Sequence, residues 1–477
     1  MIFNSLTFAV FLPIVLSLYY RLRHRGQNIL LLFASYVFYG WWDPRFLILL
    51  FISTVVDYFA AKRIGNTDSE RIRRAALAMS LCANLGILGF FKYFNFFTDS
   101  AIQLLASLDL TISRPILDIV LPVGISFYTF QTLSYTIDVY RGKLTPCRDF
   151  ATFALYVSFF PQLVAGPIER AERLLPQLEQ PRRIAFSAVQ EGLLLMLLGY
   201  FKKVGIADAL APTVDVVFAS PDRMSGYTLL IGLYFFSIQI YCDFSGYSDI
   251  ARGVARLLGV DLMVNFNQPY FSASITEFWR RWHISLSSWL KDYLYIPLGG
   301  NRKGRRRTYI NLMLTMLLGG LWHGANWTFV IWGGLHGVYL AIHKWFRRSQ
   351  RIAISNTNSS LTSRAVTACK IIVTFHLVVL SWAFFRSPTF TSAIGYVAGV
   401  LTWQDGKDWI GEFEILMAGI PVLLLAAIEV GQYRTRSHVF LLQWSWAVRG
   451  GLYAMIAILV LVSGGIDGGV PFIYFQF

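Results

Sequence analysis

The chain has 477 residues, of which 55% are hydrophobic and only 14% are charged. Soluble globular domains carry about 25% charged residues, so this composition excludes an ordinary soluble protein and indicates many segments in lipid. The formal net charge of +15 at pH 7 is compatible with nucleic-acid binding. Its distribution excludes that class, because the basic residues lie in loops between apolar runs and not in a soluble module with exposed aromatics.

Apolar runs of roughly 15–24 residues recur along the chain and predict an all-α, polytopic integral membrane protein. The first run has no basic segment ahead of it and no cleavage site, so we interpret it as a crossing and not as a signal peptide. Segments 150–167 and 274–297 are expected to dip into the membrane without crossing it. The crossings, about twelve in number, are predicted at 6–20, 28–42, 46–61, 75–97, 119–139, 189–207, 226–241, 310–327, 328–343, 366–385, 414–428 and 452–462.

Basic residues concentrate in alternate loops, such as 302–307, whereas the loops between them hold aspartates. This is the positive-inside pattern, and with twelve crossings it places both termini outside the cytoplasm. The four cysteines are scattered without CxxC spacing, so we predict neither a disulfide framework nor a metal site.

The stretch 265–327 contains two histidines, His283 and His323, among tryptophans and aliphatic residues. An ionisable side chain at membrane depth is costly and is therefore a functional-site hypothesis by default. Around His283, the spacing of Ser274 and Glu277 is that of a capping box, which predicts one helix over 274–297. Two stripes follow helical spacing: an aromatic stripe with Trp279, Trp282, Leu286, Trp289 and Tyr293, and a polar stripe with Arg280, His283, Ser287 and Lys291.

The polar stripe has two interpretations. It is the wet face of a re-entrant or interfacial helix that borders a cavity, or it is the basic face of an amphipathic helix on lipid phosphates. Asp243, Ser245, Tyr247 and Asp249 of the upstream motif YCDFSGYSDIA either shape the cytoplasmic entrance or cap a helix start.

His323 lies between glycines, at Gly319, Gly320 and Gly324. Small residues of this kind let a second helix or a ligand approach closely. Neutral imidazole titrates near pH ~6.5, so His323 is either a proton acceptor or a hydrogen-bonded core residue. His336 either lines the same cavity or makes a structural hydrogen bond, and we favour the second. His343, beside a basic loop, is expected to be solvated.

Taken together, the motifs of the chain resemble one family. FWRRWHISLSSWLKDYLYIPLGG followed by GGLWHGANWTFVIWGGLHG is similar to the membrane-bound O-acyltransferases (MBOAT), in particular to their bacterial branch of the alginate O-acetyltransferase type. The likeness extends over most of the chain from residue 3 to about 332, through SLTFAVFLPIVLSLYY, NILLLFASYVFYGWW, LPVGISFYTFQTLSYTIDVYRG, FFPQLVAGPIER and QIYCDFSGYSDIARG, and includes the ending FIYFQF.

The resemblance implies a single transmembrane domain over 1–477, with helices around a central tunnel and a catalytic core at about 265–345. It implies that His323 is the essential histidine and that His283 occupies the second polar position of the active site. Further substrate- or donor-binding candidates on these motifs are Arg280, Lys291, Trp279, Trp282, Trp322, Asn326 and His336.

The resemblance also supplies a function: transfer of acetyl from cytoplasmic acetyl-CoA to hydroxyls of an exported polysaccharide, with no bound cofactor. The location implied is the bacterial inner membrane, and the partner implied is an extracytoplasmic SGNH-hydrolase-like protein. Acylation of peptidoglycan or of a teichoic-acid-type polymer is the alternative within the class. The basic run 302–307 either meets coenzyme A phosphates or anchors the topology, and we favour the anchor.

Two functions of other classes remain open. A proton-coupled transporter would use intramembrane histidines as a relay, but it should show paired interrupted helices in two related halves, which the sequence does not contain. A non-enzymatic assembly subunit would tolerate replacement of His323.

Overall fold

A computed structural model describes residues 1–110, 117, 119–353, 360–463 and 472–473. Over these residues, the regular structure is helical, apart from one isolated bridge between Met224 and Lys407. The all-α prediction is confirmed. The chain forms two compact units, Met1–Leu193 with Ala251–Met263, and Leu194–Ile250 with Val264–Phe477. The expected assignment of 1–477 to one domain stays a prediction.

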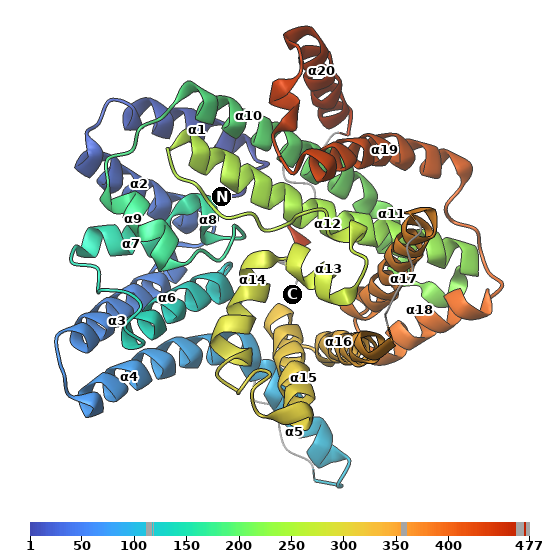
Figure 1. The fold of residues 1–477 in the computed structure, drawn as a ribbon, viewed down its shortest axis with the longest axis horizontal. Helices are drawn as coiled ribbons and strands as arrows, with labels where there is room; N and C mark the ends of the chain where they lie inside the picture. Colours follow the sequence, from blue (N-terminus) through green and yellow to red (C-terminus); the bar gives the residue numbers. More distant parts are fainter. Residues whose placement is uncertain (111–116, 118, 354–359, 464–471, 474–477) are drawn as a thin grey trace. The chain divides into compact units, whose positions relative to one another are not determined.

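In the first unit, α3, α4 and α6 lie side by side (Figure 1). A buried carboxylate, Asp57 of α3, joins them: it accepts hydrogen bonds from Ser80 and Asn84 of α4 and from Thr136 of α6. Burying such a group is tolerated because its oxygens are satisfied. The helices are α1 (Leu6–Tyr19), α2 (His24–Gly40), η1 (Pro44–Phe46), α3 (Leu47–Gly65), α4 (Glu70–Leu88), η2 (Gly89–Tyr93), α5 (Phe94–Ala106), α6 (Ile125–Tyr140), α7 (Phe150–Ser158), α8 (Phe160–Leu163) and α9 (Ala171–Glu179).

The second unit holds the stretch 265–327, which contains His283 and His323. Two of the three chain positions at which the units are divided lie in helices, one in α10 (Phe186–Tyr200) and one in α12 (Gly226–Leu257), and the third follows Met263. The other helices of this unit are η3 (Phe201–Asp208), α11 (Ala209–Ala219), η4 (Pro221–Arg223), η5 (Pro269–Phe271), α13 (Ile275–Arg281), α14 (Ile284–Leu290), η6 (Lys291–Tyr295), α15 (Gly304–His323), α16 (Trp327–Ala353), α17 (Ser360–Arg386), α18 (Phe390–Thr402), α19 (Glu412–Thr435), η7 (Phe440–Gln443) and α20 (Trp446–Val462).

Within the described residues, five helical stretches are long and apolar enough to cross a membrane: Pro44–Gly65, Glu70–Ala106, Gly226–Leu257, Arg364–Arg386 and Glu412–Thr435. The expected twelve crossings are thus not reproduced by length and composition. Several predicted boundaries also differ. The segment expected at 226–241 continues as one helix to Leu257, so Asp243 and Asp249 lie inside α12 and do not cap a helix start.

The predicted single helix over 274–297 is wrong. Half of the predicted capping box is present: the Ser274 hydroxyl accepts from the Glu277 backbone N–H, whereas the Glu277 carboxylate accepts from the N–H of Ala273, the residue before the N-cap. The first helix nevertheless ends at Arg281, α14 starts at Ile284, and the last turn is a π-helix, η6. His283 between the two helices has the left-handed backbone, with φ 43° and ψ 56°.

Candidate active site

His283 lies at the interruption between helices α13 and α14. Backbone hydrogen bonds hold the chain in place on both sides of it. The backbone N–H of Ile284 donates to the Asn265 carbonyl at 2.9 Å, and the Asn267 N–H donates to the Arg281 carbonyl at 2.9 Å. A left-handed conformation costs a non-glycine residue roughly 1–3 kcal/mol and persists only where its surroundings enforce it. The side chain is fully buried, with its ring 4.7 Å from Phe244.

His323 is the last residue of α15, and its side chain is also buried. Its ring centroid lies 6.2 Å from that of His283, so the two histidines that are 40 residues apart in sequence meet in the fold. Aromatic rings surround it: Trp322 at 5.0 Å, Trp332 at 5.2 Å and Phe385 at 5.5 Å. Apolar surroundings of this kind exclude water from a reacting group and strengthen electrostatic interactions near it.

A close approach of two helices places His323. A Cβ atom on Gly333 of α16 would lie 2.2 Å from the Met316 carbonyl oxygen of α15, and one on Gly320 would lie 2.2 Å from that of Phe329. A Cβ on Gly324 would meet the Phe329 ring at the same distance. The sequence left two roles open for the glycines near His323, the close approach of a second helix or of a ligand. These contacts support the approach of a second helix, and that helix is α16.

Three buried tryptophans extend the aromatic surroundings of the histidine pair. Trp382 lies 5.1 Å from Trp282 and 5.5 Å from Trp332 between ring centroids. In the described part of the chain, no group accepts a hydrogen bond from the indole N–H of these three residues. Buried donors are costly to leave unsatisfied, so polar atoms of a bound substrate would find partners here.

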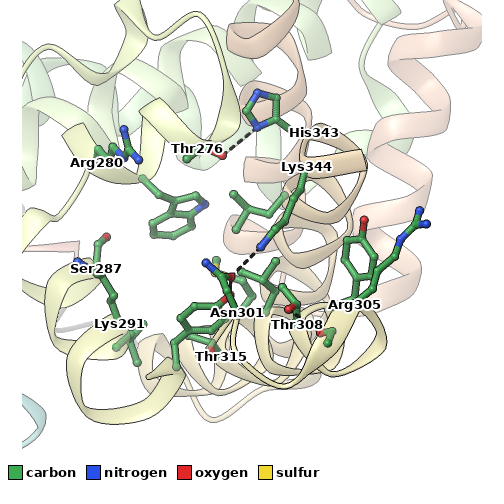
Figure 2. Close-up of a pocket in the computed structure, with 18 residues that line it drawn as sticks. Thr276, Arg280, Ser287, Lys291, Asn301, Arg305, Thr308, Thr315, His343 and Lys344 are labelled. Carbon is green, nitrogen blue, oxygen red and sulfur yellow. Dashed lines mark hydrogen bonds between the residues drawn. The ribbon is translucent and has the colours of Figure 1, made fainter. Parts of the chain in front are cut away.

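A basic pocket of about 980 Å³ lies in the same unit, between α13, α14 and η6 on one side and α15 and α16 on the other (Figure 2). Its lining includes Trp279, Tyr309 and Leu312 but, among the described residues, no carboxylate. The cationic side chains that line it are Arg280, Lys291, Arg305 and Lys344.

The cations of this basic pocket are available to an anion. Lys344 donates to Asn301 at 2.8 Å, a neutral partner, as Figure 2 shows. Neither Arg280 nor Lys291 makes an ion pair with any residue that the structure describes. The neighbouring Arg281 differs, because it pairs with Glu277 at 2.8 Å. Unneutralised cations beside an apolar wall suit a phosphorylated ligand with an apolar or uncharged arm.

The helix α15 connects the basic pocket with the histidine pair. Thr315 and Met316 line the pocket, and His323 follows Met316 by seven residues on the same helix. At a rise of 1.5 Å per residue, this separation is about 10 Å along the helix axis. The predicted polar stripe is therefore divided: Arg280, Ser287 and Lys291 line the pocket, whereas His283 does not.

The remaining predicted residues have other surroundings. His336 accepts from the Trp279 indole at 3.3 Å and contacts the Ser381 hydroxyl at 3.0 Å, which are the structural hydrogen bonds that we favoured. The Asn326 amide donates to the Pro388 carbonyl and accepts from the Thr328 N–H, so it caps α16. A substrate-binding role for either residue stays a prediction.

Some contributors were not foreseen from sequence. His343, expected to be solvated, lines the basic pocket and contacts the Thr276 hydroxyl at 2.9 Å. Behind the site, Lys203 pairs with Asp208 and Asp243, each at 2.7 Å, and Lys202 pairs with Asp249 at 2.9 Å. No sequence motif pointed to these lysines, because two of their three carboxylate partners, Asp243 and Asp249, are brought to them by α12 in the folded chain.

The comparison with known proteins decides the family. The model of "MBOAT, membrane-bound O-acyltransferase family" matches residues 148–385, which include both histidines. A probable alginate O-acetylase AlgI of Azotobacter vinelandii is 43% identical over 440 residues, covering 91% of this chain and 85% of that protein. The chain belongs to the membrane-bound O-acyltransferase family. It is therefore a membrane protein and an O-acyltransferase.

Two further relatives in this O-acyltransferase family show how far the acceptor polymer varies. A probable alginate O-acetylase AlgI of Pseudomonas putida is 38% identical over 502 residues and covers both chains completely. A peptidoglycan O-acetyltransferase of Helicobacter pylori is 36% identical, over 84% of this chain and 80% of that protein. These names agree on O-acyl transfer and differ in the polymer.

Proposed function

We propose that this O-acyltransferase moves an acetyl group from acetyl-CoA to a hydroxyl of an exported polysaccharide. The observation that carries the proposal is the basic pocket, free of carboxylates among its described lining, with α15 leading from it to the histidine pair. In this proposal the acetyl-CoA phosphates bind Arg280 and Lys291, and the uncharged arm extends along α15 toward His323. The indoles of Trp279, Trp282 and Trp322 line its path.

The reaction at the histidine pair is a direct acyl transfer. His323 takes the proton of the acceptor hydroxyl while the oxygen attacks the thioester carbonyl carbon. The new C–O bond forms, the C–S bond breaks, and the coenzyme A thiolate leaves with the proton returned by His323. His283 contributes by orienting a reactant or by hydrogen bonding.

The acceptor is proposed from the relatives and not from the geometry. Alginate-type polysaccharide is the first choice because several relatives carry that name, and peptidoglycan or a teichoic-acid-type polymer is the second. We place the protein in the bacterial inner membrane, with acetyl-CoA entering from the cytoplasm through a tunnel surrounded by about twelve crossings. An extracytoplasmic SGNH-hydrolase-like partner is the proposed intermediate acceptor.

The test measures thioester turnover by detergent-purified protein supplied with radiolabelled acetyl-CoA, acceptor polymer and partner. We expect release of coenzyme A with transfer of label to the acceptor. The variant His323→Ala should lose both while it still binds acetyl-CoA. The variant His376→Ala serves as the matched control, since His376 lies in the same unit and contacts Tyr234 instead of the site.

The same assay separates the rival functions. No turnover by the wild type with acceptor and partner supplied, together with acetate or proton movement in liposomes, would favour a transporter. Equal turnover by wild type and His323→Ala would show that His323 takes no part in the chemistry. His323 would then be a structural residue.

A further inference from the structure

The side chain of Asn265 contacts His283 on the edge that carries Nδ1. The Asn265 Oδ1 atom lies 3.2 Å from His283 Nδ1, and both groups are fully buried. Asn265 precedes the break at His283 by 18 residues, and its own carbonyl also accepts the Ile284 N–H. One residue therefore contacts both the imidazole of His283 and the backbone N–H of the next residue, Ile284.

The hydrogen bonds from Ser285 show which side-chain atom of Asn265 is the amide oxygen. The Ser285 backbone N–H donates to the same Asn265 atom at 3.2 Å, and the Ser285 hydroxyl donates to it at 2.9 Å. A backbone N–H is only a donor, so the atom that receives it must be the oxygen and not the amide nitrogen. The amide orientation is thereby determined by a hydrogen bond that cannot be reversed.

An oxygen without hydrogen that faces Nδ1 determines the tautomer of His283. A neutral imidazole carries one proton, and two lone pairs facing each other at 3.2 Å would repel, so Nδ1 carries the proton and donates it to Asn265. Burial lowers the pKa of His283 to about 3, which keeps the ring neutral at physiological pH. Nε2 is then the nitrogen with the lone pair.

We propose that Asn265 is a positioning residue which locks His283 in the Nδ1–H tautomer, so that His283 acts as a hydrogen-bond acceptor through Nε2 and orients the acceptor hydroxyl. This inference rests on the proposed function and refines it. Of the two roles open to His283, orientation is selected, and donation to the developing oxyanion is excluded for the neutral ring. The Trp332 indole N–H, which has no acceptor among the described residues, is a donor that remains for the oxyanion.

His336, another buried histidine of this unit, has the opposite arrangement. The Trp279 indole donates to Nδ1 of His336, and the Ser381 hydroxyl donates to the Val378 carbonyl, which leaves its oxygen to accept from His336 Nε2. His336 is therefore the Nε2–H tautomer. The two histidines are thus expected to be opposite tautomers, and each can serve as the reference for the other in one measurement.

The first experiment observes the tautomer directly and does not depend on turnover. Full-length protein is labelled with ¹⁵N-histidine in detergent, and His283→Gln and His336→Gln assign the two signals. We expect the ¹⁵N shifts of His283 to report a protonated Nδ1 and those of His336 a protonated Nε2. An Nε2–H signal for His283 would overturn the inference, whether or not the protein turns over acetyl-CoA.

The second experiment separates positioning from general support of the fold. Asn265→Leu removes the acceptor, and we expect kcat to fall about 10–100-fold with little change in the KM for acetyl-CoA. Asn265→Asp keeps an acceptor at the same place and adds a charge that favours the imidazolium. It should retain most of kcat while the acidic limb of the kcat–pH profile moves to higher pH.

The matched control is Ser285→Ala, which removes a hydroxyl that lies 2.9 Å from Asn265 Oδ1 and 3.4 Å from His283 Nδ1 but keeps the 3.2 Å contact between Asn265 and His283. We expect a change in kcat of less than about threefold. An equal loss in Asn265→Leu and Asn265→Asp with an unshifted pH profile would show a structural role only. A wild type without turnover would contradict the proposed function but would leave the tautomer measurement valid.

Discussion

The basic pocket and His323 share helix α15, yet the pocket and the histidine pair differ in charge and in burial. The pocket holds four cations around about 980 Å³ of space, whereas the histidines are fully buried among aromatic rings. Charges bind and orient an anionic ligand best where water and ligand can enter, and proton transfer needs a dry site with fixed partners. The difference fits the proposed division of labour, with donor binding in the pocket and chemistry at the histidines.

The largest effect should come from His323. Replacement by Ala removes the proposed base, and the expected loss in kcat is about 10²–10⁴-fold because general bases contribute that range. Binding of acetyl-CoA, measured by isothermal titration, should remain within about twofold, since the proposed site for its phosphates is the basic pocket and not His323. If acetyl-CoA binding fell as much as kcat, donor binding and chemistry would not be separate functions of the two regions.

The helix contact that places both regions is tested by Gly333→Ala. The added Cβ would lie 2.2 Å from the Met316 carbonyl, a backbone atom that cannot rotate away, so we expect destabilisation of about 1–3 kcal/mol or more and loss of transfer. The melting temperature in detergent measures it. The control is the adjacent Gly334→Ala, whose Cβ would meet only the Leu317 side chain at an ordinary 3.4 Å.

The dryness of the histidine pair predicts a pH dependence of stability. Burial depresses the pKa of His283 from 6.5 to about 3, so the unfolded chain binds a proton in this window while the folded protein does not. The contribution of His283 to the free energy of unfolding is therefore most favourable above pH 6.5. It should decrease by roughly 2 kcal/mol as the pH falls from 6.5 to 5. His283→Gln should flatten that part of a plot of melting temperature against pH. An unchanged slope would show that His283 is protonated in the folded state.

The smallest effects should arise from single cations of the basic pocket. Arg280→Gln or Lys291→Gln should raise the KM for acetyl-CoA about tenfold at low salt, with kcat nearly unchanged, and the effect should shrink as ionic strength increases. Arg281→Gln is the control for Arg280, because it removes the same charge from a side chain that already pairs with Glu277. A similar rise in KM for both arginines would indicate a field effect of net charge and not a binding site.

The segment around His283 shows which features helical spacing predicts correctly and which it misses. Periodicity placed Arg280, Ser287 and Lys291 on one face, and the structure confirms that they line one pocket. It also placed His283 on that face, and the structure does not. Spacing rules describe an uninterrupted helix, whereas the break is enforced by Asn265 and Asn267, whose hydrogen bonds come from outside the helix.

By itself, the sequence determined the helical membrane class, the family and the two histidines, because composition, apolar run length and a set of long motifs are local properties of the chain. The tertiary structure alone decided that the histidines lie 6.2 Å apart, that α15 and α16 approach at Gly333, and that the Asn265 oxygen faces His283 Nδ1. These depend on contacts between distant segments, and they are decided only when the helices pack and buried polar groups must find partners.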